Sequence, residues 1–281
     1  MARPRIAVFG VHKTGTTALW TKIRDSLPWQ PRPLFEPGRY DPDPEDRVQG
    51  VLAKVMVVPA GADLPQVEYD GFVEFERKVV IRRDPRDWLV SVVLFALQRT
   101  PLFWDDQARL DPVLADLRRK EADPLSVDTM SLFETVYCEG QGRSFEEGLA
   151  AATSRFEFLL EFEERLTGHL TVRYEDFVDD RYGDLSEYLG VEIAPGAAIV
   201  DAEYRHVPRT CAHGNWRDWL TPHDVDVLRP LLGPYMERCG YSDDWELAAE
   251  PSIPAQFGSG YVERVVTLRR RRHSPTAPLA W

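Results

Sequence analysis

Residues 6–20 read Ile-Ala-Val-Phe-Gly-Val-His-Lys-Thr-Gly-Thr-Thr-Ala-Leu-Trp, and the rest of the chain is organised around them. The apolar run 6–9 has the character of a strand, and it stops at Gly10. A small polar run over 13–17 then leads into a helical pattern over 18–27. This order predicts a strand, a tight loop and a helix. Glycine lets a backbone approach a ligand, and the free N–H groups and dipole of a first helical turn favour an anion there.

The loop also carries side chains suited to an anion. Lys13 adds a full positive charge, and hydroxyl donors come from Thr14, Thr16 and Thr17. The motif of nucleotide triphosphatases ends in Gly-Lys-Ser/Thr, whereas Lys13 stands two residues before Gly15, so this lysine would approach an anion from the first half of the loop. An ordinary strand-to-helix turn with a threonine cap and a surface lysine is the alternative.

Length and composition limit the class of protein. With 281 residues, 43% of them hydrophobic, the chain can bury a full core as one large domain or as one domain with an insertion. No apolar run approaches the ~20 residues that cross a bilayer, and residues 1–5 lack the apolar segment of a signal peptide. We therefore expect no membrane span and a cytoplasmic location.

Charge and cysteine content exclude further classes. The net charge of −12 disfavours nucleic acid as a partner, because phosphate backbones are bound by basic surfaces. A polyanionic ligand would need a local basic cleft. The three cysteines, Cys138, Cys211 and Cys239, are odd in number and widely spaced, which argues against a disulfide framework or a metal cluster.

Two further stretches are typical of buried strands. Residues 50–58 are nearly all apolar apart from Lys54, and 169–174 form another strand. We therefore expect an α/β protein of three layers, in which helices flank a central, mostly parallel sheet. A lysine in such a run either ends the strand or points into a polar cleft, since a buried unpaired ammonium is costly. Residues 28–46 carry six prolines and are expected to form an irregular loop.

A further strand, Lys78–Arg82, runs into a helix that begins near Pro85. Arg83 would stand at the carboxyl end of this strand and Ser91 further along the helix. Both positions can face the crevice in which open parallel sheets bind ligands. A guanidinium offers a planar fork to a phosphate, and a neighbouring hydroxyl closes its other side. A surface ion pair between Arg83 and a nearby aspartate is the alternative if the motif is taken alone.

Two of these motifs resemble signatures of the sulfotransferases that use 3′-phosphoadenosine-5′-phosphosulfate (PAPS). Lys-Thr-Gly-Thr-Thr at 13–17 resembles the phosphosulfate-binding loop of that family. Arg-x-Pro-x-Asp, with a serine eight residues after the arginine, resembles the family signature that holds the 3′-phosphate, and Arg83, Pro85, Asp87 and Ser91 all match it. The resemblance implies a P-loop-like sulfotransferase fold, PAPS as cosubstrate and 3′-phosphoadenosine-5′-phosphate (PAP) as product, with no metal.

Two later blocks extend the resemblance. Arg-Tyr-Glu-Asp after the strand at 169–174 is similar to a block whose tyrosine lies near the adenosine, so Tyr174 takes that role unless it is a plain core tyrosine. The family also has a late loop, Arg-Lys-Gly-x-x-Gly-Asp-Trp, that wraps the 3′-phosphate, and Arg209, Gly214 and Trp216 match it. A packed turn is the alternative. The residues that depart from the late-loop pattern are Thr210, Cys211 and Asn215.

The catalytic residues are only partly matched. We expect Lys13 to offset charge on the bridging oxygen as the phosphate leaves, with the amides of 15–17 supporting it, and Lys54 to contact the sulfate. Cytosolic relatives use as base a histidine two residues after the lysine of the second strand, but Met56 stands there, and other branches use a glutamate. The base stays open. Its candidates are His12, His206 and His213.

The organisation expected for residues 1–281 is a single sulfotransferase domain. An acidic helical excursion covers about 100–145, and a long amphipathic helix covers 145–166. A basic, flexible tail is expected over about 264–281, because its arginine cluster lies near the terminus and is followed by Ser-Pro-Thr-Ala-Pro.

The leading hypothesis is a sulfotransferase that moves a sulfuryl group from PAPS to a hydroxyl or amine of an unidentified small-molecule or glycan acceptor. One alternative is a P-loop nucleotide-dependent kinase. Another is a non-catalytic nucleotide-binding protein of the same fold, which the methionine at position 56 favours. The oligomeric state is left open.

Overall fold

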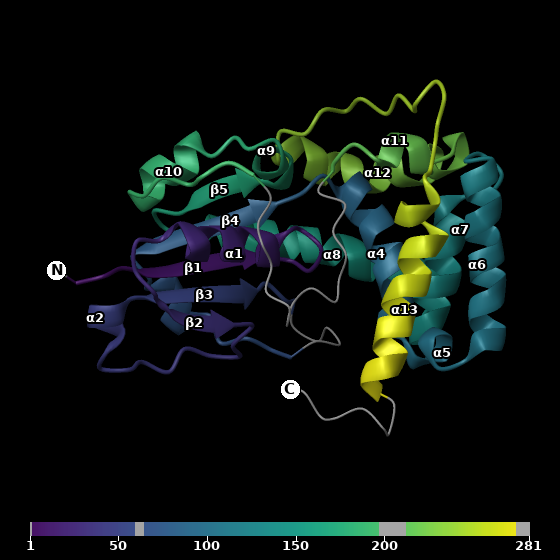
Figure 1. Ribbon diagram of the computed structural model, residues 1–281. Helices are drawn as coiled ribbons and strands as arrows, with labels where there is room; N and C mark the ends of the chain where they lie inside the picture. Colours follow the sequence, from purple (N-terminus) through teal and green to yellow (C-terminus); the bar gives the residue numbers. More distant parts are fainter. Residues whose placement is uncertain (1, 60–64, 197–211, 274–281) are drawn as a thin grey trace. The chain divides into compact units, whose positions relative to one another are not determined.

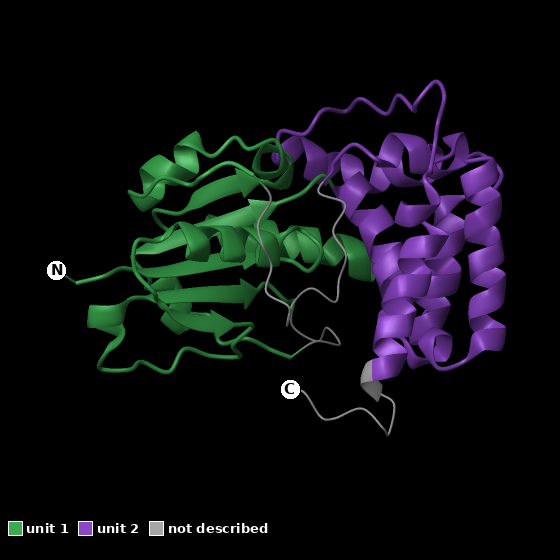
Figure 2. Cartoon of the chain, in the orientation of Figure 1, with its two compact units in different colours: residues 1–84, 151–201 green, residues 85–150, 202–281 purple. Residues whose placement is uncertain are grey.

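The computed structural model describes residues 2–59, 65–196 and 212–273. It divides the chain into two units, shown in different colours in Figure 2. Unit 1 holds residues 1–84 and 151–201, and unit 2 holds residues 85–150 and 202–281. The chain therefore passes from unit 1 to unit 2 between Asp84 and Pro85, inside the motif that begins at Arg83.

Unit 1 is built around a five-stranded sheet with the strand order β2-β3-β1-β4-β5 (Figure 1). The strands are β1 (Arg5–Gly10), β2 (Arg32–Phe35), β3 (Val51–Met56), β4 (Arg77–Arg82) and β5 (Leu170–Arg173). All neighbouring pairs are parallel, so the carboxyl ends of the strands share one edge of the sheet. This edge is where open parallel sheets bind ligands. The predicted α/β class with a parallel central sheet is confirmed.

Strand β2 is absent from the sequence-based prediction, which made 28–46 an irregular loop. Its register pairs Arg32 with Val51 and Phe35 with Lys54. The strand lies at the edge of the sheet and needs hydrogen bonds on one side only, which makes Pro33 tolerable inside it. The density of prolines concealed a strand of four residues.

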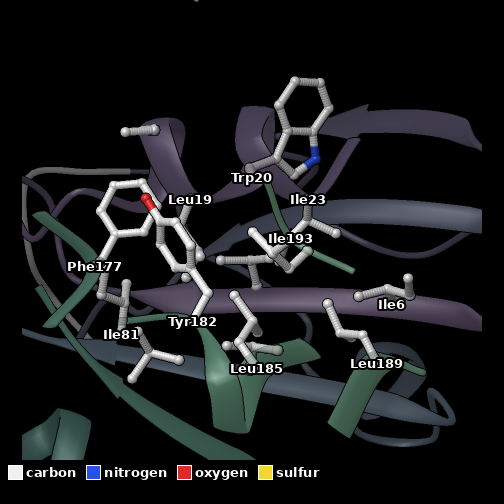
Figure 3. Packing of buried hydrophobic residues seen from close by; sticks show 14 of the residues in the cluster. Ile6, Leu19, Trp20, Ile23, Ile81, Phe177, Tyr182, Leu185, Leu189 and Ile193 are labelled. Atoms are coloured by element: carbon white, nitrogen blue, oxygen red, sulfur yellow. The ribbon is translucent and has the colours of Figure 1, made fainter. Parts of the chain in front are cut away.

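One face of the sheet is covered by α1 (Thr16–Ser26), α9 (Tyr174–Val178) and α10 (Gly183–Leu189). Figure 3 shows Leu19 and Ile23 of α1, Leu189 of α10 and Ile6 of β1 in one cluster of buried side chains. These side chains have almost no exposed surface, because apolar residues recur at helical spacing in both helices and at alternate positions in the strand.

The opposite face of the sheet is covered by the part of α8 (Phe145–Glu164) that belongs to unit 1. Phe9 alternates with Val8 along β1, and its ring lies 5.0 Å from the ring of Phe162. The ring of Tyr69 lies 4.8 Å from the same phenylalanine. Unit 1 therefore has three layers, as predicted, with helices on both faces of a sheet whose central strands are buried. Two short helices complete it, α2 (Asp46–Gln49) and α3 (Asp70–Val73).

The regular elements of unit 2, within the part that the structure describes, are all helices. Its helices are α4 (Pro85–Arg99), α5 (Pro101–Trp104), α6 (Gln107–Ala122), α7 (Thr129–Phe133), the start of α8, α11 (Trp216–Trp219), α12 (Pro222–Arg238) and α13 (Ser259–His273). A π-helical turn (Glu134–Cys138) and 3₁₀ turns (Glu139–Gln141, Ala255–Phe257) join them. The acidic segment 100–145 is thus helical, and its role as an insertion in a single domain stays a prediction. No helix within 2–59, 65–196 and 212–273 is long and apolar enough to span a membrane.

The C-terminal segment differs from the expected flexible tail. Helix α13 contains residues 264–273, including Arg269 and Arg270, and it packs against α4, α5 and α6. Val262, Val265 and Val266 recur at helical spacing and are fully buried. The apolar stripe on this helix outweighs the arginine cluster as a structural signal, because burying three such side chains contributes several kcal/mol, at roughly 1.5–3 kcal/mol each. Residues 274–281 lie outside the described residues.

Candidate functional site

The loop between β1 and α1 has an unusual backbone at two positions. Lys13 has φ 66° and Gly15 has φ 94°, both in the left-handed region, which a lysine adopts only at a cost. Gly15 is the N-cap residue of α1, so the threonine cap of the alternative interpretation is not present. The Thr14 hydroxyl donates to the Val11 carbonyl at 2.7 Å. This donor therefore shapes the loop, and its proton is committed within the protein.

Gly15 is required by the packing of an aromatic ring. A Cβ atom built on Gly15 would lie 2.5 Å from Cδ2 of Tyr174, a distance that no real Cβ contact shows. Tyr174 is the first residue of α9 and is buried. The ring therefore lies directly on the loop backbone. The sequence argument for a close approach at this glycine holds, but the group that approaches is Tyr174.

Arg83 is buried beside the same loop. Its Nη1 atom donates to the Lys13 carbonyl at 2.9 Å, and its guanidinium carbon lies 4.4 Å from the centroid of the Tyr174 ring. The register of β4 and β5 pairs Arg82 with Arg173. Arg83 and Tyr174, which follow these two residues, therefore lie side by side where the sheet ends. The structure therefore brings together three of the predicted site residues, Lys13, Arg83 and Tyr174.

One atom of this guanidinium has no partner. Arg83 is 6% exposed, and its Nε atom is buried with no hydrogen-bond acceptor among the described residues. A buried donor left unsatisfied costs about 1–3 kcal/mol, and more when the group is charged. An anionic ligand that accepts from Nε would remove this cost. Arg83 is thus a cation with unused hydrogen-bonding capacity at the ligand-binding edge of a parallel sheet.

Lys54 lies inside β3, and its ammonium forms an ion pair with Glu36. The lysine is buried and lies 4.3 Å from the centroid of the Phe35 ring, whereas the Glu36 side chain is 48% exposed. Glu36 follows β2 directly and has φ 51°. Lys54 therefore does not end its strand; it reaches a polar group at the carboxyl edge of the sheet.

Glu36 is the residue that sequence reasoning missed. The Glu36 amide donates to the Lys54 carbonyl at 2.9 Å, which continues the pairing of β2 with β3 for one residue. A carboxylate at this edge is a candidate proton acceptor, which the matched motifs lacked. Its signal in the sequence was Phe-Glu-Pro after an apolar residue, but a segment interpreted as a loop gave the glutamate no position.

The buried carboxylate of Asp46 holds β2, the strand that precedes Glu36. Arg32 pairs with Asp46 at 2.7 Å, and the hydroxyl of Tyr40 and the amide of Asp43 donate to the same carboxylate. Burial raises the pKa of Asp46, but the hydrogen bonds from Arg32, Asp43 and Tyr40 outweigh it and leave that pKa below its usual value.

Asp87, in unit 2, binds backbone amides. Its carboxylate accepts from the amide of Gly214 at 2.5 Å and from that of Trp216 at 3.1 Å. Asp87 is buried, so it fixes Gly214 and Trp216, the described end of the late loop, to the start of α4. Ser91 lies further along α4 and is half-buried.

Some of the remaining predicted residues are described by the structure, and others lie outside the described residues. Thr16 is buried in the first turn of α1, and Thr17 beside it is half-buried. His12 is half-buried before Lys13, and His213 is exposed in unit 2. Outside the described residues lie Arg209, His206, Thr210 and Cys211. The roles of Ser91, Arg209 and Gly214 toward a 3′-phosphate therefore stay predictions.

The chain is similar to solved structures of known proteins. No family model matches the chain, and no curated protein matches it. Solved structures that are similar to it include the following two. The crystal structure of mouse sulfotransferase SULT7A1 complexed with PAP is 16% identical, covers 84% of this chain and 86% of its own, and has a TM-score of 0.44. The crystal structure of retinol dehydratase in complex with androsterone and the inactive cofactor PAP is 15% identical, with 84% and 82% covered and a TM-score of 0.46.

Proposed function

We propose that this chain transfers a sulfuryl group from PAPS to a hydroxyl or amine of a small-molecule or glycan acceptor. The observation that carries the proposal is the buried guanidinium of Arg83, which contacts the loop of Lys13 and whose Nε donor has no partner in the described part of the chain. Sulfate and phosphate oxygens are acceptors that suit such a donor. The order of the sequence motifs adds support, because the loop of 13–17 and Arg83 stand at the ends of adjacent parallel strands.

The residues present suit the donor nucleotide. The N-terminal amides of α1, which begins at Thr16 after a glycine cap, would bind the 5′-phosphosulfate together with the Lys13 side chain. Arg83 would bind the 3′-phosphate through Nε, and Tyr174 would lie near the adenosine while supporting Gly15. The Thr14 hydroxyl would support the loop, because its proton goes to Val11.

The chemistry requires proton removal from the acceptor and charge stabilisation on the leaving group. In this proposal Glu36 accepts the proton of the acceptor hydroxyl as its oxygen bonds to sulfur. The bond between sulfur and the bridging oxygen breaks, and the electron pair leaves on the phosphate of PAP. Lys13 offsets that charge. The Lys54 ammonium orients the Glu36 carboxylate through their ion pair.

The first test is ligand selectivity. Thermal-shift measurements with PAP and with ATP–Mg²⁺ should show stabilisation by PAP and little by ATP–Mg²⁺, because a ligand that binds only the folded state raises the Tm. The reverse result would support the nucleotide-dependent kinase and overturn the proposal.

The second test is transfer itself. Radiolabelled sulfate should move from PAPS to at least one member of a panel of sugar, lipid, phenol and natural-product acceptors. Lys13→Ala should lower turnover by about 100- to 1000-fold, the usual effect of removing a group that stabilises transition-state charge. Binding of PAP with no transfer to any acceptor would instead favour a non-catalytic nucleotide-binding protein. Near-normal turnover by Lys13→Ala would contradict the role of that lysine.

A further inference from the structure

Arg83, Tyr174 and the loop after β1 contact one another within unit 1. Arg83 donates to the Lys13 carbonyl at 2.9 Å, and its guanidinium stacks on the Tyr174 ring at 4.4 Å. The same ring lies against the backbone of Gly15. Arg83 and Tyr174 therefore touch the loop at two residues from outside, and each contact is made by a buried side chain. We name Lys13, Gly15, Arg83 and Tyr174 the loop clamp.

The clamp acts where the loop backbone is least favourable. Lys13 is a non-glycine residue at φ 66°, a conformation that costs about 1–2 kcal/mol and persists only when its surroundings enforce it. The hydrogen bond from Arg83 fixes the peptide plane between Lys13 and Thr14. The same bond engages the Lys13 carbonyl oxygen with a cation, so its negative charge is neutralised beside a loop that has to bind an anion.

We infer that Arg83 is a positioning residue for the 5′ end of the nucleotide, in addition to a ligand of the 3′-phosphate; this inference rests on the proposed function. The guanidinium holds the loop of Lys13 in its binding conformation through Nη1 and through the Tyr174 ring, and offers Nε to the ligand. One side chain therefore organises the recognition of both ends of the donor. A ligand without a 3′-phosphate depends on Arg83 too.

This dependence separates the inference from a simple 3′-phosphate contact. PAP carries a 3′-phosphate and 5′-AMP does not. If Arg83 only binds the 3′-phosphate, its replacement lowers the affinity for PAP and leaves the affinity for 5′-AMP unchanged. If Arg83 also holds the loop, its replacement lowers the affinity for both ligands. Arg83→Lys is the suitable variant, because lysine keeps the charge, so a loss of 5′-AMP affinity is not a loss of overall attraction, while lysine lacks the planar stack and the fixed fork.

The experiment measures, in the full chain, the affinity for PAP by isothermal titration calorimetry and the affinity for 5′-AMP by competition against PAP. Arg83→Lys should lower the affinity for 5′-AMP by about tenfold, which corresponds to the loss of one hydrogen bond to a charged group. It should lower the affinity for PAP by at least as much. Arg82→Lys is the matched control. The neighbouring Arg82 forms an ion pair with Glu163 at 2.7 Å, so its replacement should change neither affinity.

A second pair of variants tests the ring if Arg83→Lys fails to fold. Tyr174→Phe keeps the aromatic face and Tyr174→Leu removes it. Inorganic pyrophosphate, which has neither adenosine nor a 3′-phosphate, should bind to Tyr174→Phe as to the unmodified chain and severalfold more weakly to Tyr174→Leu. Loss of PAP affinity alone in Arg83→Lys, or equal pyrophosphate binding by the two Tyr174 variants, would overturn the inference. Failure of the unmodified chain to bind PAP would overturn the proposed function instead.

Discussion

Arg83 and Asp87 come from one short motif, yet they differ in how they use their hydrogen-bonding capacity. Arg83 in unit 1 donates to one carbonyl and leaves a buried Nε atom without a partner among the described residues. Asp87 in unit 2 accepts from two backbone amides, those of Gly214 and Trp216. Both side chains are nearly fully buried, so burial does not distinguish them.

The difference shows which charged groups are available to a ligand. A buried carboxylate that receives backbone amides on its oxygens repays its own desolvation and stabilises the fold. Asp224 in unit 2 does the same, accepting from the amides of Thr129, Met130 and Thr221. Arg83, in contrast, still has a donor to satisfy. The predictions below follow from this contrast between available and fully used groups.

The largest effect is expected at Glu36, whose carboxylate stays exposed although Lys54 pairs with it. Glu36→Gln should lower sulfuryl transfer by about 100- to 10,000-fold, the range for loss of a general base, and leave PAP affinity nearly unchanged. Steady-state kinetics with a fixed acceptor, together with calorimetry for PAP, measure both quantities. Glu68→Gln, at an exposed glutamate of unit 1, is the control and should have no effect. Equal turnover by Glu36→Gln and the unmodified chain would mean that Glu36 is not the general base and that, like Asp87, it has only a structural role.

An intermediate effect is expected at Asp87, a fully used carboxylate. Asp87→Ala leaves two amides without their acceptor and should lower the free energy of unfolding by about 2–4 kcal/mol. Asp87→Asn keeps one acceptor oxygen and should cost less. Urea unfolding at constant pH measures both variants. A variant with unchanged stability but weakened PAP binding would instead make Asp87 part of the ligand site.

The smallest effect is expected at Asp46, a structural carboxylate within unit 1. Its pKa is below the usual value when the protein is folded, because the hydrogen bonds from Arg32, Asp43 and Tyr40 outweigh the opposing effect of burial. Its contribution to stability is therefore complete above the unfolded pKa of about 3.9 and is lost as the pH falls through the folded pKa.

The measurement is urea unfolding of the unmodified chain and of Asp46→Asn between pH 7 and pH 3. The stability difference between the two should stay constant down to about pH 4 and shrink below it. A difference that does not change with pH would mean that the charge of Asp46 contributes nothing.

The sequence predicts most of the core elements correctly because their signals are local. The apolar runs of β1, β3, β4 and β5 and the glycine-bounded start of α1 each lie within a few neighbouring residues. The helix beginning at Pro85 is likewise confirmed. Two elements escaped because a stronger local signal concealed them. Prolines concealed β2, which needs hydrogen bonds on only one side, and arginines concealed the apolar stripe of α13.

The site divides in the same way. Lys13, Arg83 and Tyr174 were each predicted as ligand residues from motifs, and their mutual contacts were not predicted. Glu36 had no motif at all, and it gained a role only when the pairing of β2 with β3 brought it to Lys54. The role of the late loop toward a phosphate stays a prediction, and the contact of its described end with Asp87 was not predicted.

The amino-acid sequence alone determined a parallel α/β core, a loop with anion-binding chemistry after its first strand, and an arginine after the strand that ends at Arg82. These follow from hydrophobic periodicity, glycine placement and charge, which are properties of neighbouring residues. Only the tertiary structure decided that Arg83 holds the Lys13 carbonyl, that Tyr174 covers Gly15, and that Glu36 meets Lys54. Each of these contacts joins segments that belong to or follow different strands, and strand register, which results from packing the whole sheet, determines which of these segments meet.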